Sequence, residues 1–237
     1  METSRKSRIE QRVLSLIANF AHYANWYDEH VPFDRPEQLG SHLRTIRRRF
    51  DLKTAAAAAA NPDFRQSLYG TLQSWGIGQR GSRLLSRAEF DMAIISAGPA
   101  IAKLDGVAID DSLLDVDAVA AQLWAIIRTL HIVDNKAPLV PCSKALHHLL
   151  PDLVVPTDRA YTRTFFGLHA PEFQGHGRPG GQRSVFTKIF CELVRIARAT
   201  NPQSYVSAAM PWRTSRTKVL DNALVGFCMA EGLQRPS

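Results

Sequence analysis

The least generic stretch of this sequence spans residues 138–167 and reads PLVPCSKALHHLLPDLVVPTDRAYTRTFFG. Its first part predicts a helix that opens near Cys142 and stops at Pro151, because proline is unfavourable in the interior of a helix. A proline-flanked extended link then leads to Thr157 and Asp158. Asp158 stands at the N-cap position of a further helix, where an aspartate accepts hydrogen bonds from free backbone amides. We therefore predict the order helix, extended link and aspartate at a helix start.

Helical spacing of apolar residues continues on both sides of this stretch. Residues 7–26, 184–199 and 214–231 each carry an apolar stripe that predicts an amphipathic helix. No convincing alternation of apolar, β-branched residues with polar ones occurs, which argues against strands. Pro99 interrupts another apolar run and is expected to kink or split its helix. The chain is therefore predicted to be all-α, a single compact globule of eight to ten helices.

The length of 237 residues favours one domain over residues 1–237. If the chain divides, the expected position is the connection 105–117, which contains five aspartates and no basic residue. A division there would give the parts 1–104 and 118–237.

The charge balance indicates an anionic partner. Lysine and arginine number 29 against 22 acidic residues, which gives a formal net charge of +7. The three cysteines form no CxxC pair, so buried reduced thiols are expected rather than disulfides or a zinc site. Neither a secretory signal nor an apolar run of membrane-spanning length occurs, so the protein is expected to be cytoplasmic and without membrane contact.

The usual cofactor signatures do not occur. The sequence has no GxGxxG, no Walker loop and no HExxH. His147 and His148 are adjacent, so on a helix they point about 100° apart and do not readily ligate one metal ion. We therefore predict no metal and no cofactor; the oligomeric state is not indicated.

The order found in residues 138–167 resembles that of the helix-hairpin-helix DNA glycosylases. In that family a hairpin precedes a helix that carries a lysine in the bifunctional members, and a Pro-Val-Asp-like segment places a catalytic aspartate at the next helix start. The matching positions are Lys144 and Asp158, the latter preceded by Val155, Pro156 and Thr157. Where the family has hairpin glycines, this chain has Val140 and Cys142. The resemblance implies a glycosylase-like scaffold with Lys144 and Asp158 as catalytic residues.

The chemistry of this pair sets a condition on Lys144. An amine that attacks a sugar carbon must be neutral, which requires a pKa lowered from about 10.4 by burial or by neighbouring cations. His147, His148 and Arg159 are the expected cationic neighbours. Asp158 would stabilise positive charge on the sugar or orient a water. The alternative is structural: an exposed Lys144 on a helix surface, and an Asp158 that only caps the next helix.

Arginines are the expected nucleic-acid contacts, because a guanidinium can hold a phosphate with two hydrogen bonds. The predicted contact residues are Arg47, Arg48, Arg80, Arg83, Arg159, Arg163, Arg213 and Arg216. The alternative is a solvated basic face, or pairing with the acidic connection 105–117. Trp75 and Trp212 precede basic residues and are expected either to stack on bases or to pack in the core.

The leading hypothesis is a nucleic-acid-binding helical protein with a glycosylase-like scaffold, which would carry out base-excision or lyase chemistry if it is an enzyme. Two alternatives stay open. One is a non-enzymatic helical domain that binds an acidic protein partner. The other is an enzyme that acts on a small phosphorylated metabolite at the glycine-rich turn 76–83, whose backbone amides could meet an anion.

Overall fold

The computed structural model describes residues 2–30, 33, 35–78, 83–134, 138–176 and 180–233, and within these ranges the chain is helical with no strand. The prediction of an all-α protein is confirmed. The described helices are α1 (Glu2–Ala18), α2 (Phe20–His30), α3 (Pro36–Asp51), α4 (Ala55–Ala60), α5 (Pro62–Ser74), α6 (Arg87–Ala102), α7 (Val116–Thr129), α8 (Leu139–Leu149), α9 (Tyr161–Phe165), α10 (Ala170–Phe173), α11 (Gly181–Thr200), the 3₁₀ helix η1 (Pro202–Tyr205) and α12 (Arg216–Ala230). These twelve α-helices exceed the expected eight to ten.

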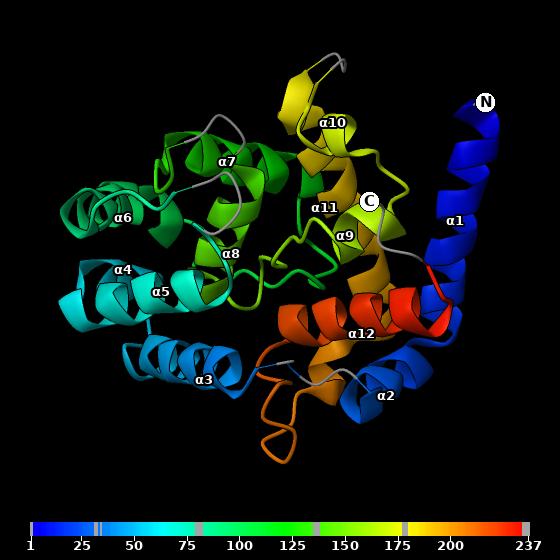
Figure 1. The fold of residues 1–237 in the computed structure, drawn as a ribbon, viewed down its shortest axis with the longest axis horizontal. Coiled ribbons are helices and arrows are strands. Elements are labelled where there is room, and N and C mark those ends of the chain that lie inside the picture. The colour runs from blue at the N-terminus through cyan, green and yellow to red at the C-terminus, as the bar shows by residue number, and fades with distance from the viewer. Residues whose placement is uncertain are drawn as a thin grey trace.

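One source of the difference is the first helix, which was predicted to run unbroken over 7–26. The structure ends α1 at Ala18 and begins α2 at Phe20, and the chain changes direction between them (Figure 1). The side chain of Asn19 donates to the carbonyl of Ser15 at 3.1 Å, the same carbonyl that accepts from the Asn19 backbone N–H. Asparagine competes with its own backbone in this way, so it is a weak point in a helix.

Pro99 was expected to kink or split its helix, and the structure shows that α6 is not split there. The helix runs from Arg87 to Ala102 with Pro99 inside it. Its start is fixed by a capping box in which Ser86 and Glu89 each satisfy the other's backbone N–H. Pro99 lies in the last turn, on the exposed side, and its missing N–H leaves one helical hydrogen bond unmade.

The two ends of the chain pack together. Helix α12 contacts α2, α9 and η1, while α11 packs against α7 and also contacts α1; α3 packs on α5 and α4 on α6 (Figure 1). A division near 105–117 would therefore separate helices that share an interface. The closest approach is at Gly226, where an added Cβ would lie 2.1 Å from the carbonyl oxygen of Tyr23.

The acidic connection between α6 and α7 joins distant parts of the fold. Asp105 pairs with Arg49 at 2.5 Å, and Asp110 pairs with Arg216 at 2.5 Å. Both pairs are largely shielded from solvent, and Arg49 also donates to the carbonyl of Leu149 at 2.7 Å. The alternative that basic residues pair with this connection is thus realised for these two arginines. None of the described helices is long and apolar enough to cross a membrane.

Candidate functional site

The predicted order around residues 138–167 is present in the structure. Helix α8 ends at Leu149, an extended link follows, and α9 begins at Tyr161. Asp158 caps α9: its Oδ1 accepts from the backbone N–H groups of Ala160 at 2.5 Å and Tyr161 at 2.7 Å. No described residue donates to its other carboxylate oxygen, Oδ2. The capping role expected from the sequence is therefore observed, and it leaves half of the carboxylate available.

Side chains of α8 hold the extended link in place. Ser143 shares a hydrogen bond of 2.6 Å with the hydroxyl of Thr157 and accepts from the Thr157 backbone N–H at 3.0 Å. His147 donates through Nδ1 to the carbonyl of Val154 at 3.0 Å. The link has no strand partner among the described residues, so these side chains satisfy backbone groups that would otherwise be buried and unpaired. They also fix Asp158 relative to α8.

Lys144 lies partly buried rather than free on the helix surface. Its Nζ is 5.5 Å from the centroid of the Trp75 ring and donates weakly to the Trp75 carbonyl at 3.4 Å. Burial lowers the pKa of Lys144; the carboxylates of Asp158 and Asp221 oppose this, while Lys218 and Arg159 reinforce it. The Asp158 carboxylate therefore acts electrostatically on Lys144.

The cationic neighbours of Lys144 differ from those expected. Arg159 contributes as predicted, but the second cation is Lys218 at the start of α12. His147 and His148 are fully buried, and burial holds the pKa of His148 at about 4 and that of His147 well below its ordinary value. Both rings are thus neutral near pH 7. The expectation of cationic histidines is wrong, because the low-dielectric interior disfavours their charged form.

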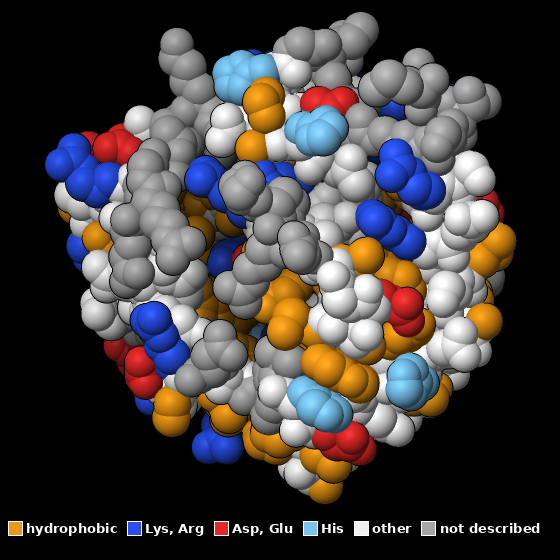
Figure 2. All heavy atoms as spheres, turned by 45° about the vertical axis from the view of Figure 1, so that its right-hand side comes forward, with side chains coloured by type: hydrophobic (Ala, Val, Ile, Leu, Met, Phe, Trp, Pro, Cys, Tyr) orange, Lys and Arg blue, Asp and Glu red, His pale blue; other side chains and the backbone are white. Residues whose placement is uncertain are grey.

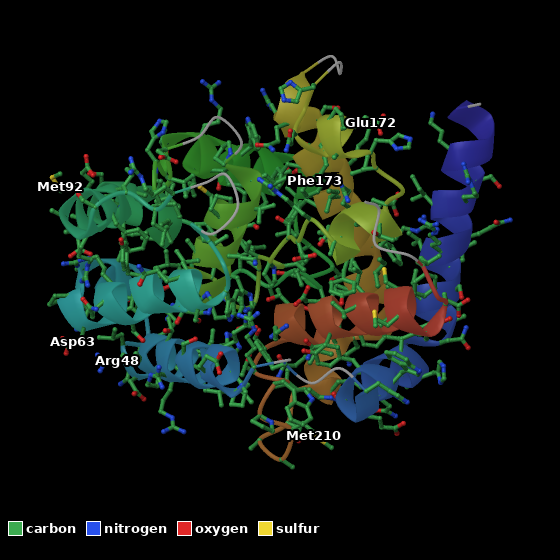
Figure 3. The ribbon with its side chains drawn as sticks, viewed as in Figure 1. Arg48, Asp63, Met92, Glu172, Phe173 and Met210 are labelled. Atoms are coloured by element: carbon green, nitrogen blue, oxygen red, sulfur yellow. The ribbon has the colours of Figure 1, made fainter. Side chains whose placement is uncertain are left out.

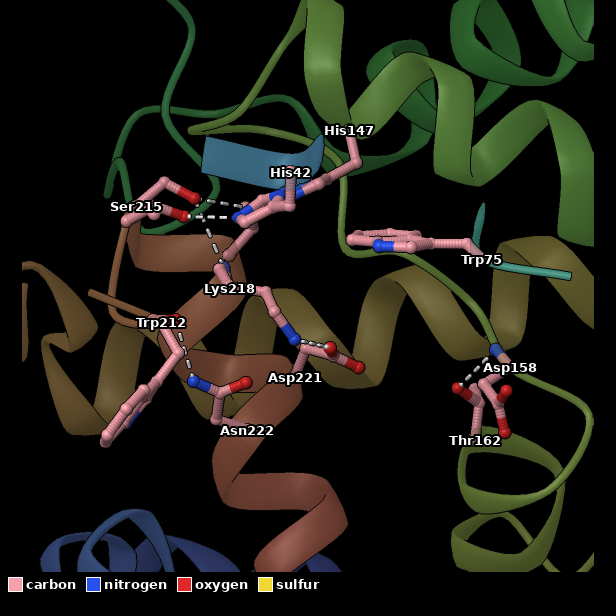
Figure 4. A network of polar contacts seen from close by, with 12 residues as sticks. His42, Trp75, His147, Asp158, Thr162, Trp212, Ser215, Lys218, Asp221 and Asn222 are labelled. Carbon is pink, nitrogen blue, oxygen red and sulfur yellow. Dashed lines mark hydrogen bonds and ion pairs between the residues drawn. The ribbon is translucent and has the colours of Figure 1, made fainter. Parts of the chain in front are cut away.

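A buried ion pair on α12 was not anticipated from the sequence. The Nζ of Lys218 lies 2.6 Å from Oδ2 of Asp221, and both side chains are almost completely shielded (Figure 4). Lys218 also lies 5.0 Å from the ring centroid of Phe33 and 5.8 Å from that of Tyr27. Burial alone would lower the pKa of Lys218, but the adjacent Asp221 raises it above its ordinary value. The only available signal was a lysine and an aspartate three residues apart in a helix rich in apolar residues.

Three buried imidazoles form the inner wall of this region. His42 of α3 joins His147 and His148, with ring centroids 5.7 and 5.1 Å from its own. His148 Nδ1 donates to the carbonyl of Lys144 at 2.8 Å, so its Nε2 must accept from Nδ1 of His42 at 3.0 Å. His42 Nε2 then accepts from the hydroxyl of Thr214 at 2.9 Å. This chain satisfies both rings in their neutral form, which fits a structural role. Among the described residues no group of three side chains is placed to hold a metal ion.

Trp75 forms the boundary between these histidines and Lys144. Its ring lies near that of His42, with the centroids 5.3 Å apart (Figure 4). Its centroid is also 5.0 Å from that of His148 and 6.2 Å from that of Phe33. Trp212, the other candidate for base stacking, donates through Nε1 to Asp28 at 2.5 Å. Both indoles therefore have internal packing partners. Of the glycine-rich turn 76–83, only the ends are described, with Gly76 and Gly78 at the positive φ values of 77° and 105°.

The predicted nucleic-acid contacts fall into two groups. Arg47 and Arg159 are exposed and have no ion pair with any described residue. Arg48 lies 3.5 Å from Asp63 at the outer edge of α3 and α5 (Figure 3), and Arg83, 84% exposed, lies 3.4 Å from Asp134. Such exposed pairs are worth about 0–1 kcal/mol, so a phosphate can replace the carboxylate. These four arginines are available to an anion.

Three of the other predicted arginines, Arg163, Arg213 and Arg216, are shielded from solvent. Arg163 is buried. Arg213 lies 2.6 Å from Asp28 and is shielded from solvent, and Arg216 pairs with both Asp110 and Asp152. Arg80 lies outside the described residues. The basic run that follows Trp212 therefore serves internal pairing.

No protein-family model matches this chain, and searches among curated proteins and among solved structures also found no match. The resemblance to the helix-hairpin-helix glycosylases thus rests on the residues of the stretch 138–167 alone.

Proposed function

We propose that this protein binds nucleic acid and that Lys144 and Asp158 act on the sugar of an abasic or damaged nucleotide. The observation that carries the proposal is a partly buried amine over the face of Trp75, within electrostatic range of a carboxylate that has one oxygen free. Burial lowers the pKa of Lys144, which increases the neutral, nucleophilic fraction of the amine near pH 7.

The reaction follows from the chemistry of the two groups. The lone pair of neutral Nζ attacks C1′ of the ring-opened sugar aldehyde, and loss of water from the carbinolamine leaves an imine between Lys144 and the sugar. Oδ2 of Asp158 accepts a proton from the attacking nitrogen while solvent protonates the aldehyde oxygen, and it returns this proton to the departing hydroxyl, which leaves as water. The carboxylate, ionised again, then stabilises the cationic imine. The capping bonds to Oδ1 fix the orientation of the carboxylate.

The exposed arginines supply the phosphate contacts that binding requires. Arg47 and Arg48 lie on α3, and Arg159 directly follows Asp158. Lysine and arginine side chains are dispersed over the face in Figure 2 rather than gathered into one stripe. Binding through such separated contacts depends on counterion release, so affinity should fall steeply with added salt.

Borohydride trapping on a duplex with one abasic site tests the proposal. We expect a stable cross-link with the unmodified protein and none with Lys144→Ala, because only the neutral amine at this position forms the imine. Lys188→Ala removes an exposed lysine of α11 and should leave the yield unchanged. Asp158→Asn retains a capping oxygen but loses the charge, so trapping should slow by about 10- to 100-fold.

Two results would contradict the proposal. One is an undiminished cross-link in folded Lys144→Ala, which would place the reactive amine elsewhere. The other is the absence of a cross-link with the unmodified protein at concentrations where it binds the duplex.

A further inference from the structure

A second basic surface lies away from Lys144, on the last turns of α7 and the start of α11. These elements enclose an open hollow of about 710 Å³ whose lining includes Trp124, Arg128, Thr129, His131 and Arg183. The hollow shares no residue with the Lys144 site. No acidic side chain is part of its lining.

The basic side chains of the hollow lack the partners that other arginines have. Arg128, His131 and Arg183 are exposed, and none forms an ion pair or a side-chain hydrogen bond with another described residue. On the same helix as Arg183, Arg195 pairs with Glu10 at 2.5 Å and Arg198 donates to the carbonyl of Asp111 at 2.8 Å. Like Arg47 and Arg159, the basic side chains of the hollow are therefore not neutralised by a described residue.

The position of Arg183 is unfavourable for the helix that carries it. Helix α11 begins at Gly181, so Arg183 stands in its first turn, where the free backbone amides already concentrate positive charge. That turn contains no acidic residue, and no side chain caps it. Arg128, by contrast, lies in the last turn of α7, where a cation is favourable. A bound anion would relieve the repulsion at Arg183.

The lining also contains apolar side chains. Trp124 is 9% exposed, and its ring centroid lies 5.8 Å from that of Phe186, so the wall that carries Arg128 is packed against the helix that carries Arg183. Guanidinium groups match the oxygen geometry of phosphate.

We propose that this hollow binds a phosphate group through Arg128 and Arg183, with His131 at its rim. The phosphate could belong to a nucleic-acid backbone or to a small phosphorylated molecule, since both present the same oxygens. The inference does not depend on any reaction at Lys144.

The test uses a 20-base-pair duplex without an abasic site and inorganic phosphate as probes. The double variant Arg128→Gln/Arg183→Gln is compared with Lys103→Gln/Lys188→Gln, which removes the same charge from exposed positions outside the hollow. Fluorescence anisotropy gives duplex affinity at several salt concentrations. We expect the duplex affinity to fall at least tenfold in the hollow variant and less than threefold in the control variant. The slope of log affinity against log salt concentration should be smaller by about 1–2 in the hollow variant, since each phosphate contact contributes about 0.9.

Inorganic phosphate separates the two sources of the ligand. One outcome is that phosphate shifts the Arg128 and Arg183 side-chain NMR signals in a saturable way, while the hollow variant shows no tenfold loss of duplex affinity. This outcome would support a phosphate site in the hollow and assign it to a small phosphorylated molecule. The inference is overturned if phosphate causes no such shifts and the hollow variant loses no more duplex affinity than the control variant. A failure here is distinct from a failure at Lys144, because the duplex affinity of the hollow variant and the borohydride cross-link formed by the unmodified protein are measured separately.

Discussion

Gly226→Ala should destabilise the protein by about 2–3 kcal/mol and lower Tm by roughly 5–10 °C. A Cβ at this position would lie 2.1 Å from the carbonyl oxygen and 3.0 Å from the carbonyl carbon of Tyr23. Both are backbone atoms of α2, so no side-chain rotation can relieve the overlap and the α2–α12 crossing itself must open. Thermal or urea unfolding, followed by circular dichroism, measures the effect.

Gly70→Ala is the matched control for this substitution. Gly70 lies inside α5, and a Cβ there would meet no atom within 4 Å. Because alanine is the better helix former, this variant should gain up to about 1 kcal/mol. Equal stability of Gly226→Ala and the unmodified protein would mean that the two helices do not cross as closely as described.

Acid should remove a large part of the stability, starting near pH 6.5. His42, His147 and His148 are buried in their neutral forms, and burial lowers the pKa of each below the ordinary value of 6.5. Below pH 6.5 the unfolded chain therefore binds protons that the folded chain does not, so stability falls as the pH falls. His148, with a pKa of about 4, alone accounts for roughly 3 kcal/mol at pH 4. The nearby ammonium groups of Lys144 and Lys218 further oppose its protonation.

Urea unfolding at pH 8, 6 and 4.5 measures this loss. His148→Asn is expected to be less stable at pH 8 but to lose less stability between pH 8 and 4.5, because one of the three titrating groups is gone. His22 is exposed, so His22→Asn should follow the pH dependence of the unmodified protein. Identical pH dependence in all three proteins would contradict the role assigned to the buried histidines.

Local features of the fold could be read from the sequence. Asp158 was expected to cap a helix, because proline and apolar spacing mark the end of one helix and the start of the next. Its hydrogen bonds to the backbone of Ala160 and Tyr161 confirm this cap. The cap of α5 by Asn61 and the capping box at Ser86 are equally local. Such features depend on neighbours within about four residues.

The composition of the candidate site could not be predicted, because it depends on pairings across the fold. His42 and His148 are separated by 106 positions and still share a hydrogen bond. Lys218 reaches the surroundings of Lys144 from the last helix, and Arg216 meets Asp110 across 106 positions. Neither charge nor apolar spacing indicates which arginine remains exposed, so Arg47 and Arg216 were equivalent as sequence but differ in the structure.

The proposed reaction depends most directly on the protonation of Lys144. NMR of lysine labelled with ¹³C at Cε can follow this protonation as the pH is raised. The signal is assigned through Lys144→Arg, and exposed Lys188 serves as the internal reference. We expect the pKa of Lys144 to lie below the ordinary value of 10.5 and to fall further in Asp158→Asn, because the Asp158 carboxylate raises it. A Lys144 that titrates together with Lys188 and does not respond to Asp158→Asn would contradict the account.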